Sequence, residues 1–145
     1  MNQNHRSVIE DNDRYILPLT GRSVSRCYVD FALGLCFFSD GPATKIRIEG
    51  RISLLSNGQE ISANPNDPSS LGPLLILFGK SVTAAEAVKD GTLRIAFEGG
   101  LVLRVDADDK YEAWELVADD GLKLVSSPGG QLAYWKSQPL KTKSN

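Results

Sequence analysis

The stretch Thr92–Val105 reads TLRIAFEGGLVLRV and alternates apolar with polar residues on either side of a Gly-Gly pair. Residues two apart point to the same side of a strand, so each half presents one apolar face. The residues that share this apolar face are Leu93, Ile95, Phe97, Leu101, Leu103 and Val105. Glycine supplies the positive φ that a tight hairpin needs. The stretch therefore predicts a hairpin with one face in the core and the other in solvent.

Similar strand-like runs recur along the whole chain and are separated by glycine-containing turns such as Ser56-Asn57-Gly58. The runs are residues 23–31, 33–38, 44–49, 51–55, 82–88, 92–97, 101–105, 111–117, 122–125 and 132–135. This pattern is typical of an all-β meander. We expect a mainly β fold of the α+β kind: a curled antiparallel β meander or partly open barrel with one short helix packed on it.

One segment breaks the strand pattern. Four large apolar residues recur at the spacing i, i+3, i+4 and i+7, namely Leu71, Leu74, Leu75 and Phe78. This spacing places all four on one face of an α-helix. Ser70 is suited to cap its N-terminus, and Gly79 follows its last residue. The spacing predicts a helix over residues 70–78 that buries these four side chains.

The chain has the length and composition of one globular domain. It contains 145 residues, of which 41% are hydrophobic and 23% charged, and these proportions are typical of folded proteins. Residues 1–14 and 136–145 are polar and have few apolar side chains to offset the entropy of ordering them. We expect a single domain over residues 15–135 with mobile polar tails on both sides.

The sequence also favours a cytoplasmic protein. It has no signal-peptide pattern, and its longest apolar stretch, residues 71–78, is far shorter than the roughly 18 residues of a membrane span. Cys27 and Cys36 lack the spacing of a zinc or redox motif, so we expect two reduced thiols. The net charge of −2 argues against nucleic-acid binding, because proteins that neutralise phosphates usually carry a basic excess.

No motif for catalysis or for a cofactor is recognisable. The lone histidine, His5, lies in the N-terminal tail, which excludes a His-based triad or a His-containing metal cluster on the domain. Glycine-rich phosphate-binding motifs are missing, and residues 106–109 lack the pattern of an EF-hand loop. We expect no cofactor, no metal and no enzymatic activity. An enzyme of unfamiliar type that uses carboxylates remains an alternative.

Acidic residues concentrate between Asp106 and Asp120, where seven acids accompany one base, Lys110. This window carries −6 (7 acids minus 1 base), whereas the whole chain carries −2. We predict that the acids gather with Tyr111 at one edge of the sheet and form an anionic surface for a basic protein partner. The predicted partner-binding residues are Asp106, Asp108, Asp109, Tyr111, Glu112, Glu115, Asp119 and Asp120.

Two other interpretations stay open. An acidic face of this kind is more often a solubilising surface, and Trp114 then lies in the core with Leu116, because the two share one side of a strand. The chain is also compatible with a small-ligand-binding β-barrel. Its interior would be lined by Leu93, Ile95, Leu103 and Trp114.

Residues 67–97 (DPSSLGPLLILFGKSVTAAEAVKDGTLRIAF), 110–116 (KYEAWEL) and 127–135 (SPGGQLAYW) resemble a family of short uncharacterised bacterial proteins. Residues 30–50, with DFALGLCFFSDG and KIRIEG, are similar to the same family. The resemblance covers most of residues 30–135 and implies no assigned activity. The small size and style of the sequence are also similar to immunity proteins of bacterial toxin systems. That similarity implies a non-catalytic inhibitor that occludes a basic toxin domain.

Overall fold

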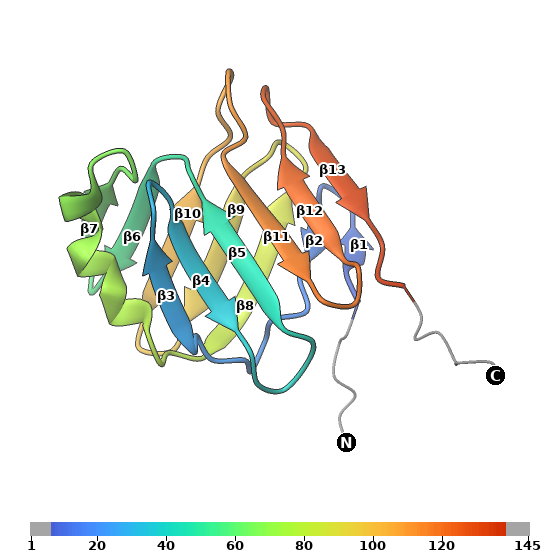
Figure 1. The fold of residues 1–145 in the computed structure, drawn as a ribbon, viewed down its shortest axis with the longest axis horizontal. Coiled ribbons are helices and arrows are strands. Elements are labelled where there is room, and N and C mark those ends of the chain that lie inside the picture. The colour runs from blue at the N-terminus through green and yellow to red at the C-terminus, as the bar shows by residue number, and fades with distance from the viewer. Residues whose placement is uncertain (1–6, 139–145) are drawn as a thin grey trace.

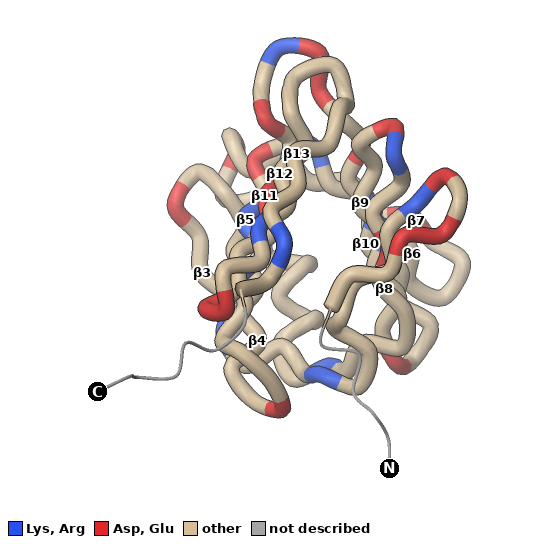
Figure 2. The backbone as a smooth tube through the Cα atoms, turned by 90° about the vertical axis from the view of Figure 1, so that its right-hand side faces the viewer, with Lys and Arg blue, Asp and Glu red and all other residues tan. Residues whose placement is uncertain are grey.

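The computed structural model describes residues 7–138, which form two antiparallel sheets packed face to face (Figure 1). The strands of the first sheet, in spatial order, are β1 (Ile9–Asp11), β2 (Arg14–Ile16), β8 (Val82–Val88), β9 (Leu93–Phe97), β10 (Leu101–Val105), β6 (Ile52–Ser56) and β7 (Gln59–Ala63). The strands of the second sheet are β13 (Leu132–Trp135), β12 (Lys123–Ser126), β11 (Trp114–Ala118), β5 (Thr44–Ile48), β4 (Leu33–Phe37) and β3 (Arg26–Val29). Figure 2 shows the two sheets as separate layers.

The predicted class, mainly β with one short helix, is confirmed. The strands divide into two sheets and do not continue as one curled meander or close into a barrel. The division follows from long-range pairing, in which β5 pairs with β11 and β6 pairs with β10. Apolar side chains from the inner faces of both sheets form one continuous core.

The predicted hairpin of residues 92–105 is confirmed. Leu93 lies opposite Val105 and Phe97 opposite Leu101, and the turn between them has positive φ values of 81° and 79° at Gly99 and Gly100. All six residues of the predicted apolar face are buried. Alternation of apolar and polar residues was therefore sufficient to predict this part of the core.

The N-terminal boundary of the domain differs from the prediction. Residues 9–14, which the composition assigns to a polar tail, contain β1 and the start of β2, and β2 pairs with β8. The polar strand β7 is a second element that sequence analysis missed. Both β1 and β7 are edge strands, which are often short and charged and so give weak patterns. His5 and residues 139–145 lie outside the described residues.

The predicted α-helix is a 3-10 helix, η1 (Pro68–Leu77), on the side of the sandwich bordered by β7 and β3 (Figure 1). A 3-10 helix has three residues per turn, so the buried positions recur every third residue. They are Leu71, Leu74 and Leu77, whereas Leu75 and Phe78 are 44% and 60% exposed. The Ser70 hydroxyl bonds Asn64 and Asp67 and does not occupy the N-cap position.

A buried tryptophan joins the two sheets, as the core interpretation of Trp114 predicts. Its side chain is 1% exposed, and its indole N–H donates to the carbonyl oxygen of Gly91, 2.9 Å away. The hydroxyl of Ser126 donates to the same oxygen at 2.9 Å. Gly91 lies in the turn between β8 and β9, so this interaction connects the first sheet to the second.

At the other end of the sandwich, the buried guanidinium of Arg22 holds the loop between β4 and β5. It donates to the carbonyl oxygens of Phe37, Ser39 and Pro42 at 2.9, 3.1 and 2.7 Å, and to the Thr44 hydroxyl at 3.1 Å. Burial lowers the pKa of Arg22 from its ordinary value, because the charged form loses water. These hydrogen bonds replace the lost hydration.

Two further predictions concern the thiols and the membrane. Cys27 and Cys36 are both free thiols, and they point to opposite faces of the sheet because Cys27 pairs with Leu35 and Cys36 with Arg26. Burial raises the pKa of each thiol. Within residues 7–138, no helix is long and apolar enough to cross a membrane.

Two leucine-to-alanine substitutions test whether the buried residues of η1 follow the 3-10 spacing. Leu74→Ala should lower the free energy of unfolding by about 2–5 kcal/mol, because it empties a fully buried site. Leu75→Ala, one residue later and partly exposed, should cost about 0.5 kcal/mol or less. Urea denaturation measures both. Equal losses for the two variants would restore the α-helical spacing and contradict the 3-10 assignment.

Candidate binding cleft at one end of the sandwich

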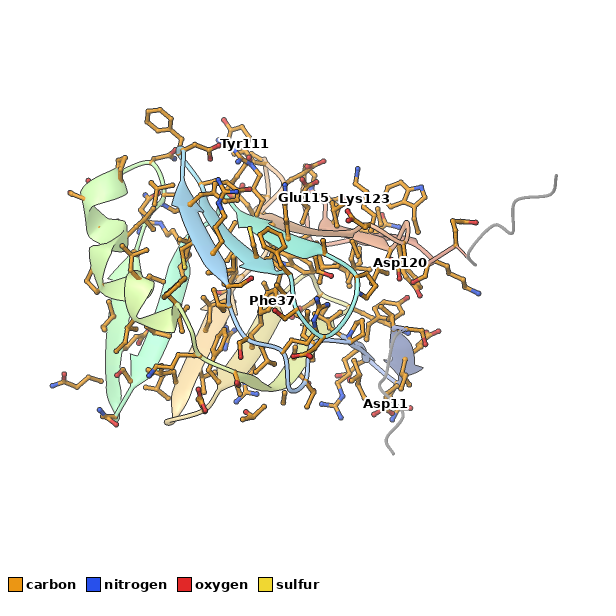
Figure 3. The ribbon with its side chains drawn as sticks, turned by 60° about the horizontal axis from the view of Figure 1, so that its bottom comes forward. Asp11, Phe37, Tyr111, Glu115, Asp120 and Lys123 are labelled. Carbon is orange, nitrogen blue, oxygen red and sulfur yellow. The ribbon has the colours of Figure 1, made fainter. Side chains whose placement is uncertain are left out.

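The predicted acidic residues do not lie along one edge of a sheet. Strand β11 is an internal strand between β12 and β5. Residues 106–113 precede it and residues 119–121 follow it, so its length of roughly 17 Å separates the two groups. Figure 3 shows Tyr111 and Asp120 at opposite ends of β11, with Glu115 between them. The single acidic edge predicted from the sequence is therefore wrong.

Three of the predicted acids stabilise their own segment of chain. Asp106 accepts from the guanidinium of Arg104 at 2.8 Å. Asp120 accepts from the amide of Leu122 at 3.1 Å and shapes the turn into β12. Asp108 accepts from two backbone amides in the loop before β11. Among residues 7–138, the remaining predicted acids have no side-chain hydrogen bond or ion pair: Asp109, Glu112, Glu115 and Asp119.

The loop before β11 forms one wall of a cleft of about 400 Å³. The other walls come from the β3–β4 turn, the β5–β6 connection and the loop between β7 and η1. Its lining includes two aromatic rings, three carboxylates and one guanidinium, from Phe31, Tyr111, Glu49, Asp108, Glu112 and Arg51. The volume falls in the range of ligand-binding clefts, roughly 300–1,000 Å³.

The two aromatic residues of the cleft are unusually exposed. Phe31 is 69% exposed and Tyr111 is 67% exposed, the highest values among the large apolar and aromatic side chains of the described residues. Phe31 also has a φ of +63°, in the left-handed region that costs an L-residue about 1–2 kcal/mol. The turn Asp30-Phe31-Ala32 therefore places a bulky ring in water at an energetic cost.

Negative charge dominates the cleft. Glu49 forms an ion pair with Arg47 at 2.9 Å, and Arg47 also contacts Asp30 at 2.8 Å. The hydrogen bond to Glu49 is the main reason that the pKa of Arg47 is raised. A small depression of about 70 Å³ continues from the cleft and is lined by Arg47, Glu49, Glu112, Trp114 and Glu115. Its three carboxylates outnumber the single guanidinium, so negative charge continues onto β11.

A second cleft of about 390 Å³ adjoins the first and shares Arg51 and Asn64 with it. The ion-paired residues Arg104 and Asp106 line this second cleft. The structure thus brings Asp108, Tyr111, Glu112 and Glu115 around one site, with Asp106 beside it. Asp109 is exposed in the same loop. Asp119 and Asp120 lie at the far end of β11.

Sequence reasoning missed Phe31, Glu49 and Arg51, which come from turns distant in the sequence. The available signal was the bulky aromatic Phe31 at the end of the strand-like run 23–31, with one residue between it and the next run at 33–38, where a turn usually has small or polar residues. The residues suggested for a ligand-lined interior have a different role: Leu93, Ile95, Leu103 and Trp114 pack in the core with exposures of 0–1%. No group of three metal-ligating side chains occurs within residues 7–138.

The conformational cost at Phe31 leads to a stability prediction. Phe31→Asn should raise the free energy of unfolding by about 0.5–1 kcal/mol, because asparagine adopts the left-handed region more readily and the exposed ring contributes little packing. Thermal and urea denaturation measure the change. A loss of stability would show that the ring packs favourably and that Phe31 is an ordinary structural residue.

Among known proteins, no curated protein and no solved structure matches the chain. A family model described as a family of unknown function (DUF6188) matches residues 15–136. This match agrees with the resemblance of the sequence to an uncharacterised family. The chain belongs to DUF6188, a family of unknown function.

Proposed function

We propose that this chain is a non-catalytic binding protein whose end cleft receives a basic segment of a partner protein. One observation carries the proposal: the two most exposed large aromatic side chains, Phe31 and Tyr111, line the same cleft as three carboxylates. Aromatic residues in such positions commonly provide most of the affinity of a protein interface. On this proposal, the strained backbone at Phe31 is retained because it presents the ring to a partner.

The charges of the cleft suit a cationic partner. Glu112 has no ion pair with the described residues and borders both the cleft and its small extension. Exposed carboxylates contribute modestly to affinity, but they accelerate association with a basic protein at low ionic strength. We therefore assign affinity mainly to the rings of Phe31 and Tyr111 and steering mainly to Glu112.

A toxin domain is the partner that this chemistry suggests, and the small size and style of the sequence, which are like those of immunity proteins, favour the same partner. Toxins that act on nucleic acids need a basic active site to hold phosphates. An acidic cleft with aromatic anchors is complementary to such a site, so its inhibition requires occlusion and no catalytic residue. The competing explanation is that the acids only keep the chain soluble. That explanation gives the exposed rings of Phe31 and Tyr111 no role.

The proposal is tested by capture and affinity measurements on a partner from the native cell. The wild-type chain, used as bait, should retain a basic protein. Its dissociation constant should rise about 30-fold or more on Phe31→Ala or Tyr111→Ala, equivalent to about 2 kcal/mol per anchor. Phe78→Ala, an exposed phenylalanine on the chain segment that follows η1, should change affinity by less than about twofold.

The role of the charges is tested in the same experiment with one cleft variant and one control variant. Glu112→Gln should slow association at low salt, and the difference should shrink as salt rises, because steering is screened beyond about 8 Å at physiological ionic strength. Asp119→Asn, at the far end of β11, should leave the rate unchanged. If the cleft variants and their controls bind equally well, the cleft is not the interface.

A further inference from the structure

We infer that Asp108 is a positioning residue, whose carboxylate holds Tyr111 in place over the cleft and is not itself the charge that a partner recognises. The importance of Tyr111 rests on the proposed function, but the positioning itself is a property of the free chain. Asp108 and Glu112 lie in the same acidic stretch of the sequence but have different roles.

The geometry of the loop supports this role. One carboxylate oxygen of Asp108 accepts from the amide of Lys110 at 2.7 Å and from the amide of Tyr111 at 3.0 Å. Aspartate and asparagine characteristically fix turns by bonding backbone amides two and three residues ahead. The carboxylate therefore fixes the backbone on which the Tyr111 ring is carried.

The backbone of Asp108 connects this turn to the rigid part of the fold. Its carbonyl oxygen accepts from the amide of Gly129 at 2.8 Å, in the turn between β12 and β13. The next residue, Gly130, packs against the turn that carries Gly91, the acceptor of the Trp114 indole. Tyr111 is thus linked through Asp108 to the buried contact between the two sheets.

Tyr111 needs such support because residues 109–112 are exposed, and the backbone hydrogen bonds that anchor the loop lie outside them, at Asp108 and Ala113. Residues 106–113 lie between β10 and β11 and form no strand pair, and Tyr111 and Glu112 are exposed. Without the carboxylate, the amides of Lys110 and Tyr111 would bond water and the ring would move more freely. Ordering a mobile side chain on binding weakens affinity by a factor of about 2–10.

Glu112 differs from Asp108 in its contacts. It follows Tyr111 directly, lines the cleft, and accepts no side-chain hydrogen bond from the described residues. Its charge is available to a partner, whereas one oxygen of Asp108 is already used by two amides. A neutral hydrogen-bond acceptor at position 108 should therefore still hold Tyr111 in place. Loss of the charge at position 112 should slow association with a basic partner.

The test uses fluorine NMR of the full chain labelled with 3-fluorotyrosine, which has four tyrosines and hence four signals. Tyr111→Phe assigns the Tyr111 signal. Asp108→Asn should leave that signal at its wild-type position, because the amide oxygen still accepts both N–H groups. Asp108→Ala should move it toward the free-tyrosine position and narrow it, and Asp108→Ser should fall between. The other three signals should stay fixed and so confirm the fold.

Two results would overturn the inference: an unchanged Tyr111 signal in Asp108→Ala, or equal shifts in Asp108→Asn and Asp108→Ala, which would identify charge as the relevant property. Binding to the captured partner adds a separate readout. Asp108→Asn and Asp108→Ala lose the same charge, so the positioning role is read from their difference: Asp108→Ala should bind about 2–10-fold more weakly than Asp108→Asn. If the signals behave as expected but Tyr111→Ala binds normally, the positioning stands and the proposed function fails.

Discussion

The carbonyl oxygen of Gly91 accepts hydrogen bonds from the Trp114 indole and the Ser126 hydroxyl, each at 2.9 Å, and so joins the two sheets at one end. Apolar burial holds the layers together but is non-directional, whereas these bonds also define their relative position. The contact requires glycine, because a Cβ at Gly91 would lie 2.7 Å from the backbone of Gly130. The side chain of Ala107 packs at the same point, so the loop that forms the cleft begins at this contact.

Local patterns predicted the parts of the fold that depend on neighbouring residues. Alternation identified the hairpin of β9 and β10, and Asn57-Gly58 forms the predicted turn with φ values of 52° and 79°. The division into two sheets depends on pairs distant in sequence, such as β2 with β8, which alternation does not specify. The short helix was predicted at the correct place, but its spacing was wrong because Leu71 and Leu74 fit both helical spacings, and tertiary packing selected Leu77 as the third buried residue.

The site was predictable to the extent that its residues are adjacent in sequence. The acidic window led to Asp108, Tyr111 and Glu112, which do share a cleft. Its extension to Asp119 and Asp120 failed because a strand carries the chain to the opposite end of the sheet. Phe31 joins the cleft only through the topology, since the β3–β4 turn reaches it from the other end of the sequence. Counting charges also did not reveal that Asp108 bonds backbone amides.

We propose that a basic protein binds at the cleft around Phe31 and Tyr111, and not over the acidic surface as a whole. Amide hydrogen exchange of the chain, free and in complex with its captured partner, distinguishes the two binding sites. Binding at the cleft should slow exchange in residues 30–32, 49–51, 64–66 and 108–112 and leave residues 118–121 unchanged. Protection confined to residues 118–121, or spread evenly over the acidic residues at both ends of β11, would exclude the cleft as the binding site.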